Sequence, residues 1–190
     1  LTTSLEGEDL SKKITNQIGI MPGSDPIVLV MKKNSSNLKN LLVWLHHVHG
    51  PALSFKKGVP DGYVPGLVKD TPILLIDDEA DNASINTKKR DSQGDPDGVT
   101  AINGLIRLLL GACSRSAYVG YTATPFANIL INDEVRTSVH GADLFPRSFI
   151  IHVPPPSNYI GPDKVFGLDE NPDAGISAAD PLPVVRLVED

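Results

Sequence analysis

The sequence contains one cysteine among 190 residues, Cys113, which excludes an internal disulfide framework and fits a reducing compartment. Cys113 lies in an apolar stretch, so we expect a small core residue rather than a reactive thiol. Long apolar runs are also missing, since none approaches the ~20 residues that span a bilayer. No basic segment followed by an apolar one opens the chain, as a secretion signal would. These absences predict a cytoplasmic protein with no membrane partner.

Excess positive charge is missing as well. The formal net charge is −6, so the chain is not a simple basic module that coats nucleic acid. A few local contacts with nucleic acid would still be possible. Charged residues make up 21% and hydrophobic residues 41% of the sequence, which is typical of a folded domain with a sizeable core.

Four short apolar runs are nearly continuous rather than alternating, which is typical of strands buried on both faces of a parallel sheet. They cover residues 27–31, 73–76, 117–121 and 149–153. Apolar residues between them recur at three- and four-residue steps, which predicts helices over 38–48 and 102–109. Strands that alternate with helices predict an α/β fold, with a mostly parallel sheet sandwiched by helices.

The ends of these elements can also be predicted. Ser35 or Ser36 could cap the first of the two helices, and Thr100 could cap the second. Residues 8–18 could form a further short helix. Residues 49–70 are rich in glycine and proline and predict a long loop.

The C-terminal part of the chain has a different composition. Residues 154–190 include seven prolines and show little apolar periodicity, so we expect an irregular Pro-rich tail or linker. We therefore divide the chain into one domain over 1–153 and a tail over 154–190 that packs on it.

A cluster of acids follows the apolar run 73–76. Residues Asp77 to Asp81 hold four carboxylates in five positions, which repel one another and are costly to bury without a cation. Ligands bind at the carboxyl ends of strands in open α/β sheets, so a hydrated Mg²⁺ ion and a polyphosphate would explain the cluster. A solvated turn is the alternative for an isolated acidic quartet.

A second strand end completes a resemblance. Val119 to Pro125 is an apolar run followed by small hydroxyl residues and a proline suited to a helix start. Asp78 to Asp81, Asp-Glu-Ala-Asp, resembles the second motif of superfamily-two helicases, and Thr122-Ala123-Thr124 resembles their third motif. More narrowly, the sequence resembles the Z-one domain, a helicase-like family associated with restriction endonucleases. That resemblance is carried by residues 75–87, 120–128 and 154–161.

The resemblance implies a RecA-like motor domain that uses ATP and Mg²⁺ and acts on nucleic acid, with DNA the expected substrate. Asp78 would anchor the metal, and Glu79 would orient or deprotonate the attacking water. Asp81 would link the nucleotide pocket to Thr122 and Thr124, which would couple nucleotide state to strand movement. The system implied is one of restriction or DNA defence.

Other polar residues leave alternatives open. Lys32, Lys33 and Asn34 precede a predicted helix and could bind nucleic acid, or form a solvated, capped helix start. Asp77 lies outside the helicase tetrad and could support the site or face solvent. A basic run over 88–90 is expected to be a solvated loop. The histidines at 46, 47 and 49 favour core packing over a metal site, because neighbouring helical positions point in different directions.

Parts of the family pattern are missing. The sequence has no Gly-Lys dipeptide, and therefore no phosphate-binding loop of the form G-x-x-x-x-G-K-[ST]. Because the chain starts at Leu1 rather than at a methionine, we interpret it as part of a longer polypeptide whose other domains complete the site. We expect the isolated chain to be inactive as an ATPase. The rival functions are a Mg²⁺-dependent endonuclease domain and a non-catalytic scaffold. No lysine follows an acid at the Asp/Glu-x-Lys spacing, which counts against a nuclease.

Overall fold

The computed structural model describes residues 26–56, 59–87, 98–134, 136–174 and 176–183. The chain divides into two compact units, Leu1–Ser148 and Phe149–Asp190. The helix predicted at 8–18 and the basic run at 88–90 lie outside the described residues.

Helix α2 (Ser35–His49) starts three residues before the predicted range of 38–48 and ends one residue after it. Its cap is Asn34, not Ser35 or Ser36, and the Asn34 side chain accepts a hydrogen bond from the amide of Asn37 at 2.8 Å. Asn34 has extended backbone angles (φ −137°, ψ 160°), and asparagine caps helices as well as serine does. The prediction that a polar side chain caps this helix is therefore confirmed, but the residue predicted to do so was wrong.

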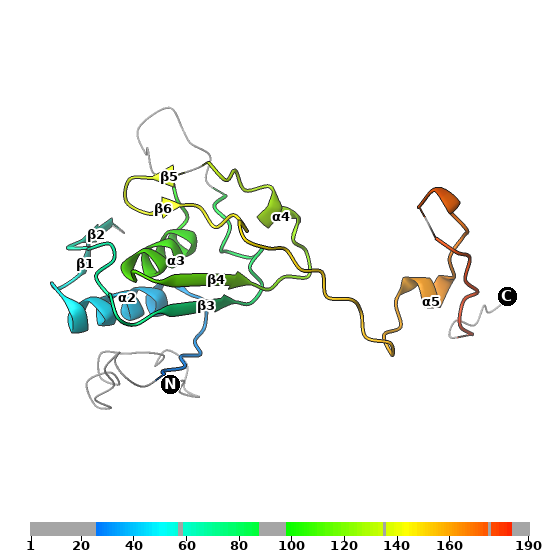
Figure 1. The fold of residues 1–190 in the computed structure, drawn as a ribbon, viewed down its shortest axis with the longest axis horizontal. Coiled ribbons are helices and arrows are strands. Elements are labelled where there is room, and N and C mark those ends of the chain that lie inside the picture. The colour runs from blue at the N-terminus through cyan, green and yellow to red at the C-terminus, as the bar shows by residue number, and fades with distance from the viewer. Residues whose placement is uncertain (1–25, 57–58, 88–97, 135, 175, 184–190) are drawn as a thin grey trace, which may run out of the picture. The chain divides into compact units, whose positions relative to one another are not determined.

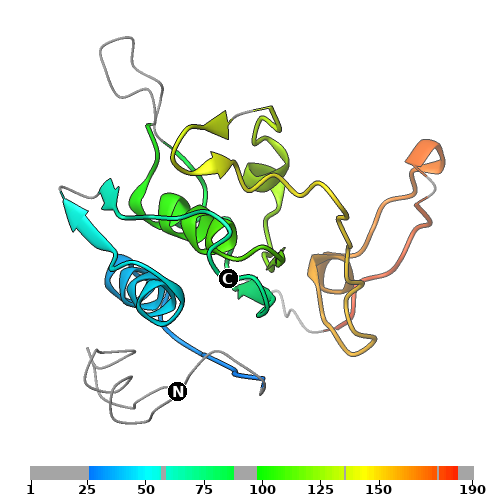
Figure 2. The same cartoon turned by 60° about the vertical axis from the view of Figure 1, so that its left-hand side comes forward.

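Strands β3 (Ile73–Asp77) and β4 (Ser116–Gly120) form a parallel pair that runs in register along all five residues. Helix α3 (Ala101–Ala112) lies between them in sequence, as the crossover of a parallel pair requires. Figure 1 shows the two strands side by side with α3 running along them, and Figure 2 shows the same unit turned by 60°. This β3–α3–β4 unit brings the ends of both strands to one edge.

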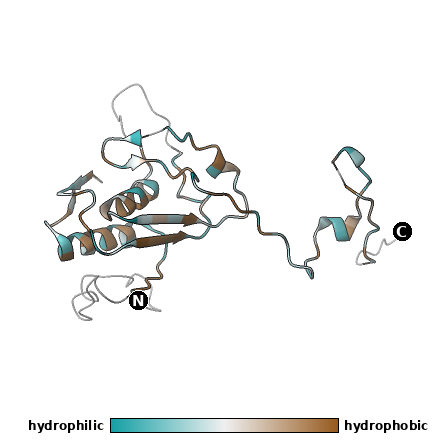
Figure 3. Ribbon diagram, in the orientation of Figure 1, coloured by the Kyte–Doolittle hydropathy of each residue, from teal (hydrophilic) through white to brown (hydrophobic). Residues whose placement is uncertain are grey.

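The core lies between this unit and α2, which packs against α3. Leucines at the predicted spacing face inward, and Cys113 is buried among them, as expected. Figure 3 shows hydrophobic colouring along β3 and both hydrophobic and hydrophilic residues around the two helices. The most deeply buried apolar side chains of the two helices are Leu42, Ile106, Leu108, Leu109 and Ala112.

The predicted sheet is larger than the one observed. Residues 27–31 and 149–153, predicted as buried strands, lie outside helices and strands, and Val28 and Ile151 are 79% and 72% exposed. An apolar strand is buried on both faces only between neighbouring strands and covering layers. Within the described residues β3 and β4 are the only strands that pair in parallel, beside one isolated parallel bridge between Val68 and Cys113, so the fold is mixed α/β with small two-stranded sheets.

Two antiparallel pairs lie elsewhere in the first unit. The segment predicted as a loop over 49–70 contains β1 (Ser54–Lys56) paired with β2 (Val59–Asp61). A second pair joins β5 (Arg136–Thr137) to β6 (Gly141–Ala142). Between β4 and β5 lies the short helix α4 (Phe126–Ile129).

The second unit is mostly irregular, in keeping with its proline content. It contains α5 (Pro162–Phe166) and the 3₁₀ turn η1 (Pro172–Ala174). No helix in the described part of the chain is long and apolar enough to cross a membrane.

Candidate active site

The two motifs predicted from the sequence meet at one edge of the β3–β4 pair. The amide of Tyr121 donates to the carbonyl of Asp77 at 2.8 Å, and the amide of Ala80 donates to the carbonyl of Tyr121 at 2.9 Å. Parallel pairing places Asp77 opposite Gly120, so the segments that follow β3 and β4 leave the sheet at the same edge. We call residues 78–81 the acid turn and residues 122–124 the threonine turn.

A side-chain hydrogen bond joins the two turns. Thr124 Oγ1 donates to Asp81 Oδ2, and the amide of Thr124 in turn donates to Thr122 Oγ1 at 2.9 Å. Hydrogen bonds from Thr124 and then Thr122 hold the pKa of Asp81 below its ordinary value. The carboxylate is therefore ionised at neutral pH and ties the threonine turn to the acid turn.

Asp78 and Glu79 are exposed at the tip of the acid turn. Glu79 has a φ of 51°, a left-handed conformation that costs a residue with a Cβ about 1–2 kcal/mol. The Asp78 side chain accepts a hydrogen bond from the Glu79 amide at 3.1 Å. Strained backbone of this kind persists only where neighbouring contacts hold it, and it is frequent at functional sites.

Asp77 is 4% exposed, which rules out the solvent-facing alternative. Its carboxylate pairs with Lys33 Nζ at 2.9 Å and accepts hydrogen bonds from Ser84 Oγ at 2.6 Å and from Tyr118 Oη at 2.7 Å. Burial, followed by the hydrogen bond to Asp77, raises the pKa of Tyr118. Asp77 thus anchors the acid turn from beneath.

The three residues considered for nucleic-acid binding separate in the structure. Lys32 is exposed, Asn34 caps α2, and Lys33 reaches the acid turn. Besides Asp77, Lys33 Nζ donates to the carbonyls of Asp78 and Glu79 at 2.9 and 2.8 Å. The three therefore form no common surface of side chains.

Sequence reasoning missed three residues that hold this site. Ser84 and Tyr118 bind Asp77, and Asn128 Nδ2 donates to the carbonyl of Ala80 at 3.2 Å. The one available signal was position, because Ser84 and Asn128 lie inside the segments that carried the family resemblance. Tyr118 carried no such signal, because it lies in an apolar strand outside the segments of the resemblance.

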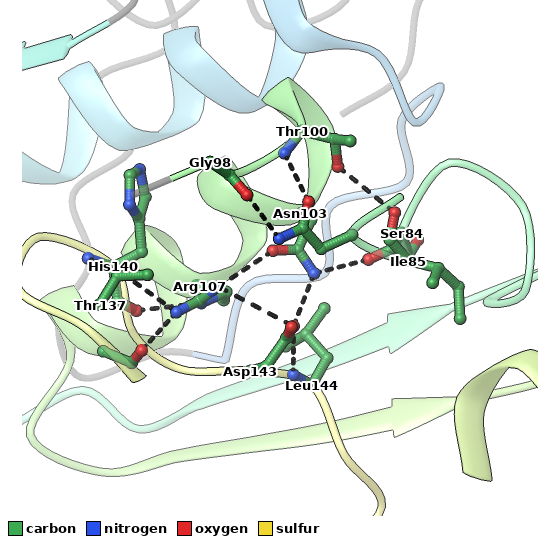
Figure 4. A network of polar contacts seen from close by, with 12 residues as sticks. Ser84, Ile85, Gly98, Thr100, Asn103, Arg107, Thr137, His140, Asp143 and Leu144 are labelled. Atoms are coloured by element: carbon green, nitrogen blue, oxygen red, sulfur yellow. Dashed lines mark hydrogen bonds and ion pairs between the residues drawn. The ribbon is translucent and has the colours of Figure 1, made fainter. Parts of the chain in front are cut away.

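A buried polar network extends from Ser84 to the β5–β6 pair (Figure 4). Asn103 Nδ2 donates to the carbonyl of Ser84 at 2.8 Å and to Asp143 Oδ1 at 2.9 Å. Arg107 Nη1 donates to Asn103 Oδ1 at 3.3 Å and lies 3.9 Å from Asp143 Oδ1. These contacts fasten the loop that follows the acid turn to α3.

The start of α3 is held by the same loop. Thr100, predicted as its cap, makes no capping bond with its side chain. Its Oγ1 donates instead to the carbonyl of Ile85 at 3.3 Å, and its amide donates to Asn86 Oδ1 at 3.1 Å. Figure 4 shows Thr100 and Ile85 facing each other across this contact.

The acid turn offers two exposed carboxylates, those of Asp78 and Glu79, that could hold a hydrated metal ion. Asp78 and Glu79 form no ion pair with any described residue, so their carboxylates are available to a hydrated cation. Mg²⁺ keeps several waters and uses one or two carboxylates together with substrate phosphates. Among the described residues, no cluster of three or more His, Cys, Asp or Glu side chains could hold a metal ion by itself. His46 lies apart from this edge, buried on α2 with its ring 5.5 Å from that of Tyr63.

No protein-family model matches the sequence, and no curated protein or solved structure is significantly similar to it. The resemblance to helicases and to the Z-one domain therefore stays a hypothesis that rests on the motifs and on the geometry of the two turns.

Proposed function

We propose that this chain carries the acid and threonine motifs of a RecA-like, helicase-like motor that hydrolyses ATP and acts on DNA. The observation that carries the proposal is the hydrogen bond between Thr124 and Asp81 at the shared edge of β3 and β4. A solvated acidic turn has no need of a specific hydroxyl partner from a second motif. A motor that couples nucleotide state to movement needs such a link.

The residues divide the work as follows. Asp78 would hold a hydrated Mg²⁺ ion, which would neutralise charge on the phosphates of bound ATP. Glu79 accepts a proton from the attacking water or orients it. Asp81 transmits a change in the acid turn to Thr122 and Thr124 and so to the helix that follows them. Other domains of the polypeptide supply the phosphate-binding loop, further strands of the RecA-like sheet, and any nuclease of a restriction or defence system.

The proposal is tested in the intact protein with variants that separate these roles. Glu79→Gln should leave nucleotide affinity near wild type and reduce hydrolysis by about 10²–10⁴-fold, because it removes a general base. Asp78→Ala should instead weaken Mg²⁺-dependent nucleotide binding. Thr124→Val should keep much of the basal turnover and abolish its stimulation by DNA.

A matched control is Glu134→Gln, which makes the same chemical change at an exposed position of the first unit. It should behave as wild type in nucleotide binding, basal turnover and DNA-stimulated turnover. If Glu79→Gln hydrolyses ATP normally while DNA cleavage disappears, the carboxylates serve an endonuclease and the motor proposal is wrong.

A further inference from the structure

The side chain of Lys33 points into the protein, although it lies in the segment just before α2. Its ammonium group lies within 3.2 Å of Ser84 Oγ and within 2.9 Å of an Asp77 carboxylate oxygen and two backbone carbonyls. The side chain is 24% exposed and that of Asp77 is 3% exposed. The ammonium group has three hydrogens, and oxygen atoms of the protein satisfy all of its hydrogen-bonding capacity.

The two carbonyls belong to the peptide groups on either side of Glu79. Lys33 Nζ lies 2.9 Å from the carbonyl oxygen of Asp78 and 2.8 Å from that of Glu79. One cation therefore draws together the two peptides that flank the residue with the left-handed φ of 51°. The direction of the Glu79 Cα–Cβ bond follows from that backbone conformation, so the contacts of Lys33 act on the point from which the carboxylate is presented.

The neighbouring lysine gives a contrast. Lys32 is exposed, and only its backbone carbonyl contacts the start of α2 within the described residues. If both lysines bound nucleic acid, both ammonium groups would face solvent. The inward position of Lys33 instead joins the start of α2 to the acid turn, across 46 residues of sequence.

We propose that Lys33 is the positioning residue that holds Glu79 in its left-handed conformation and so orients the carboxylate that activates water. The functional part of this statement rests on the proposed ATPase. The structural part, that Lys33 holds the acid turn, can be tested without it.

The structural part is tested by hydrogen exchange in the intact protein. The amides of Ala80 and Asn82 donate to the carbonyls of Tyr121 and Glu79, both at 2.9 Å, and they report on the acid turn. Lys33→Met should speed their exchange by on the order of tenfold, because local opening becomes easier. Lys69→Met is the matched control, since this exposed lysine also loses one charge while its side chain has no partner in the described part of the chain.

Lys33→Met leaves Asp77 as a buried, uncompensated charge, which could unfold the protein. The paired variant Lys33→Met with Asp77→Asn removes both charges and still releases the carbonyls of Asp78 and Glu79. It should fold, and it should show the same faster exchange of the acid-turn amides.

The functional part is tested by a double-mutant cycle. Lys33→Met should lower basal kcat by about 10–10²-fold, as expected for a misplaced catalytic group, with little change in nucleotide affinity. In a Glu79→Gln background the same change should cause no further loss, because Lys33 acts through Glu79. A purely structural role would lower the residual rate and the nucleotide affinity as well.

Two results would overturn the inference. Unchanged exchange at Ala80 and Asn82 together with a loss of DNA affinity would make Lys33 a nucleic-acid contact. Additive losses of kcat in the cycle would show that it does not act through Glu79. If Glu79→Gln leaves hydrolysis at the wild-type rate, the proposed ATPase is wrong, and the exchange data alone decide whether Lys33 holds the turn.

Discussion

A buried carboxylate organises the site at the scale of single residues. Asp77 satisfies its two oxygens with Lys33, Ser84 and Tyr118, each from a different part of the chain. Burying a charge is favourable only when partners of this kind replace water. The exposed acids Asp78 and Glu79 follow this buried carboxylate directly in the sequence.

The hydrogen bond from Tyr118 to Asp77 should contribute measurably to stability. Tyr118→Phe removes a donor to a buried carboxylate, so the free energy of unfolding should fall by about 1–3 kcal/mol. Tyr121→Phe is the control, since the Tyr121 side chain is 56% exposed. Urea denaturation of both variants checks the prediction, and equal effects would contradict it.

A second prediction concerns pH and His46. Burial lowers the pKa of His46 from its ordinary value of 6.5, so the unfolded chain binds the proton more tightly than the folded protein does. The stability that depends on neutral His46 is complete above that value and is lost as the pH falls below it. The urea midpoint should therefore be lower at about pH 5.5 than at about pH 7.5, and His46→Leu should reduce the difference. An unchanged difference in the variant would contradict this.

At the scale of elements, the close approach of the acid turn to β4 depends on a glycine. A Cβ placed on Gly120 would lie 2.8 Å from the Cβ of Ala80, which is itself buried. Only glycine at the end of β4 lets the acid turn fold across that strand and bring Asp81 to Thr124.

Gly120→Ala should therefore destabilise the protein by about 1–3 kcal/mol, as overpacking does, and disturb the acid turn. The double variant Gly120→Ala with Ala80→Gly returns the space and should recover part of the loss. Urea denaturation of the two single variants and the double variant measures this. If the loss of stability in the double variant equals the sum of the losses in the two single variants, the contact between positions 120 and 80 does not limit the packing.

At the scale of the whole molecule, α2 and α3 cover one face of the β3–β4 pair. Along β3, Ile73 and Leu75 pack against the core, while Leu74 and Ile76 are 60% and 62% exposed. No described residue of the first unit buries these two side chains. A RecA-like sheet has helices on both faces, so this open face agrees with the proposal that other parts of the polypeptide complete the fold.

The two faces of β3 can be compared with one chemical change at adjacent positions. Leu75→Ser should lower the free energy of unfolding by more than about 1 kcal/mol, because Leu75 packs on the core. Leu74→Ser should change it by no more than about 0.5 kcal/mol and should reduce binding of a hydrophobic dye. If Leu74→Ser is as destabilising as Leu75→Ser, the outer face is covered in solution.

The local pattern of the sequence determined the two long helices and the two strands that end in the motifs. Apolar spacing of three and four residues predicts the buried faces of α2 and α3, and a short apolar run predicts β3 and β4. The meeting of the acid and threonine turns followed too, because parallel strands end at the same edge. These features depend on neighbours a few residues apart or on strand direction alone.

Only the tertiary structure decided which polar residues support the site. Lys33 looked like a solvent-facing lysine and Asp77 was undecided, yet they form an ion pair across 44 residues that no local pattern encodes. In the same way, residues 27–31 and 149–153 are as apolar as β3, but neither segment forms a strand in the described structure. Burial of a strand is a property of the sheet around it, and burial of a charge depends on distant partners. The chain's own periodicity specifies neither.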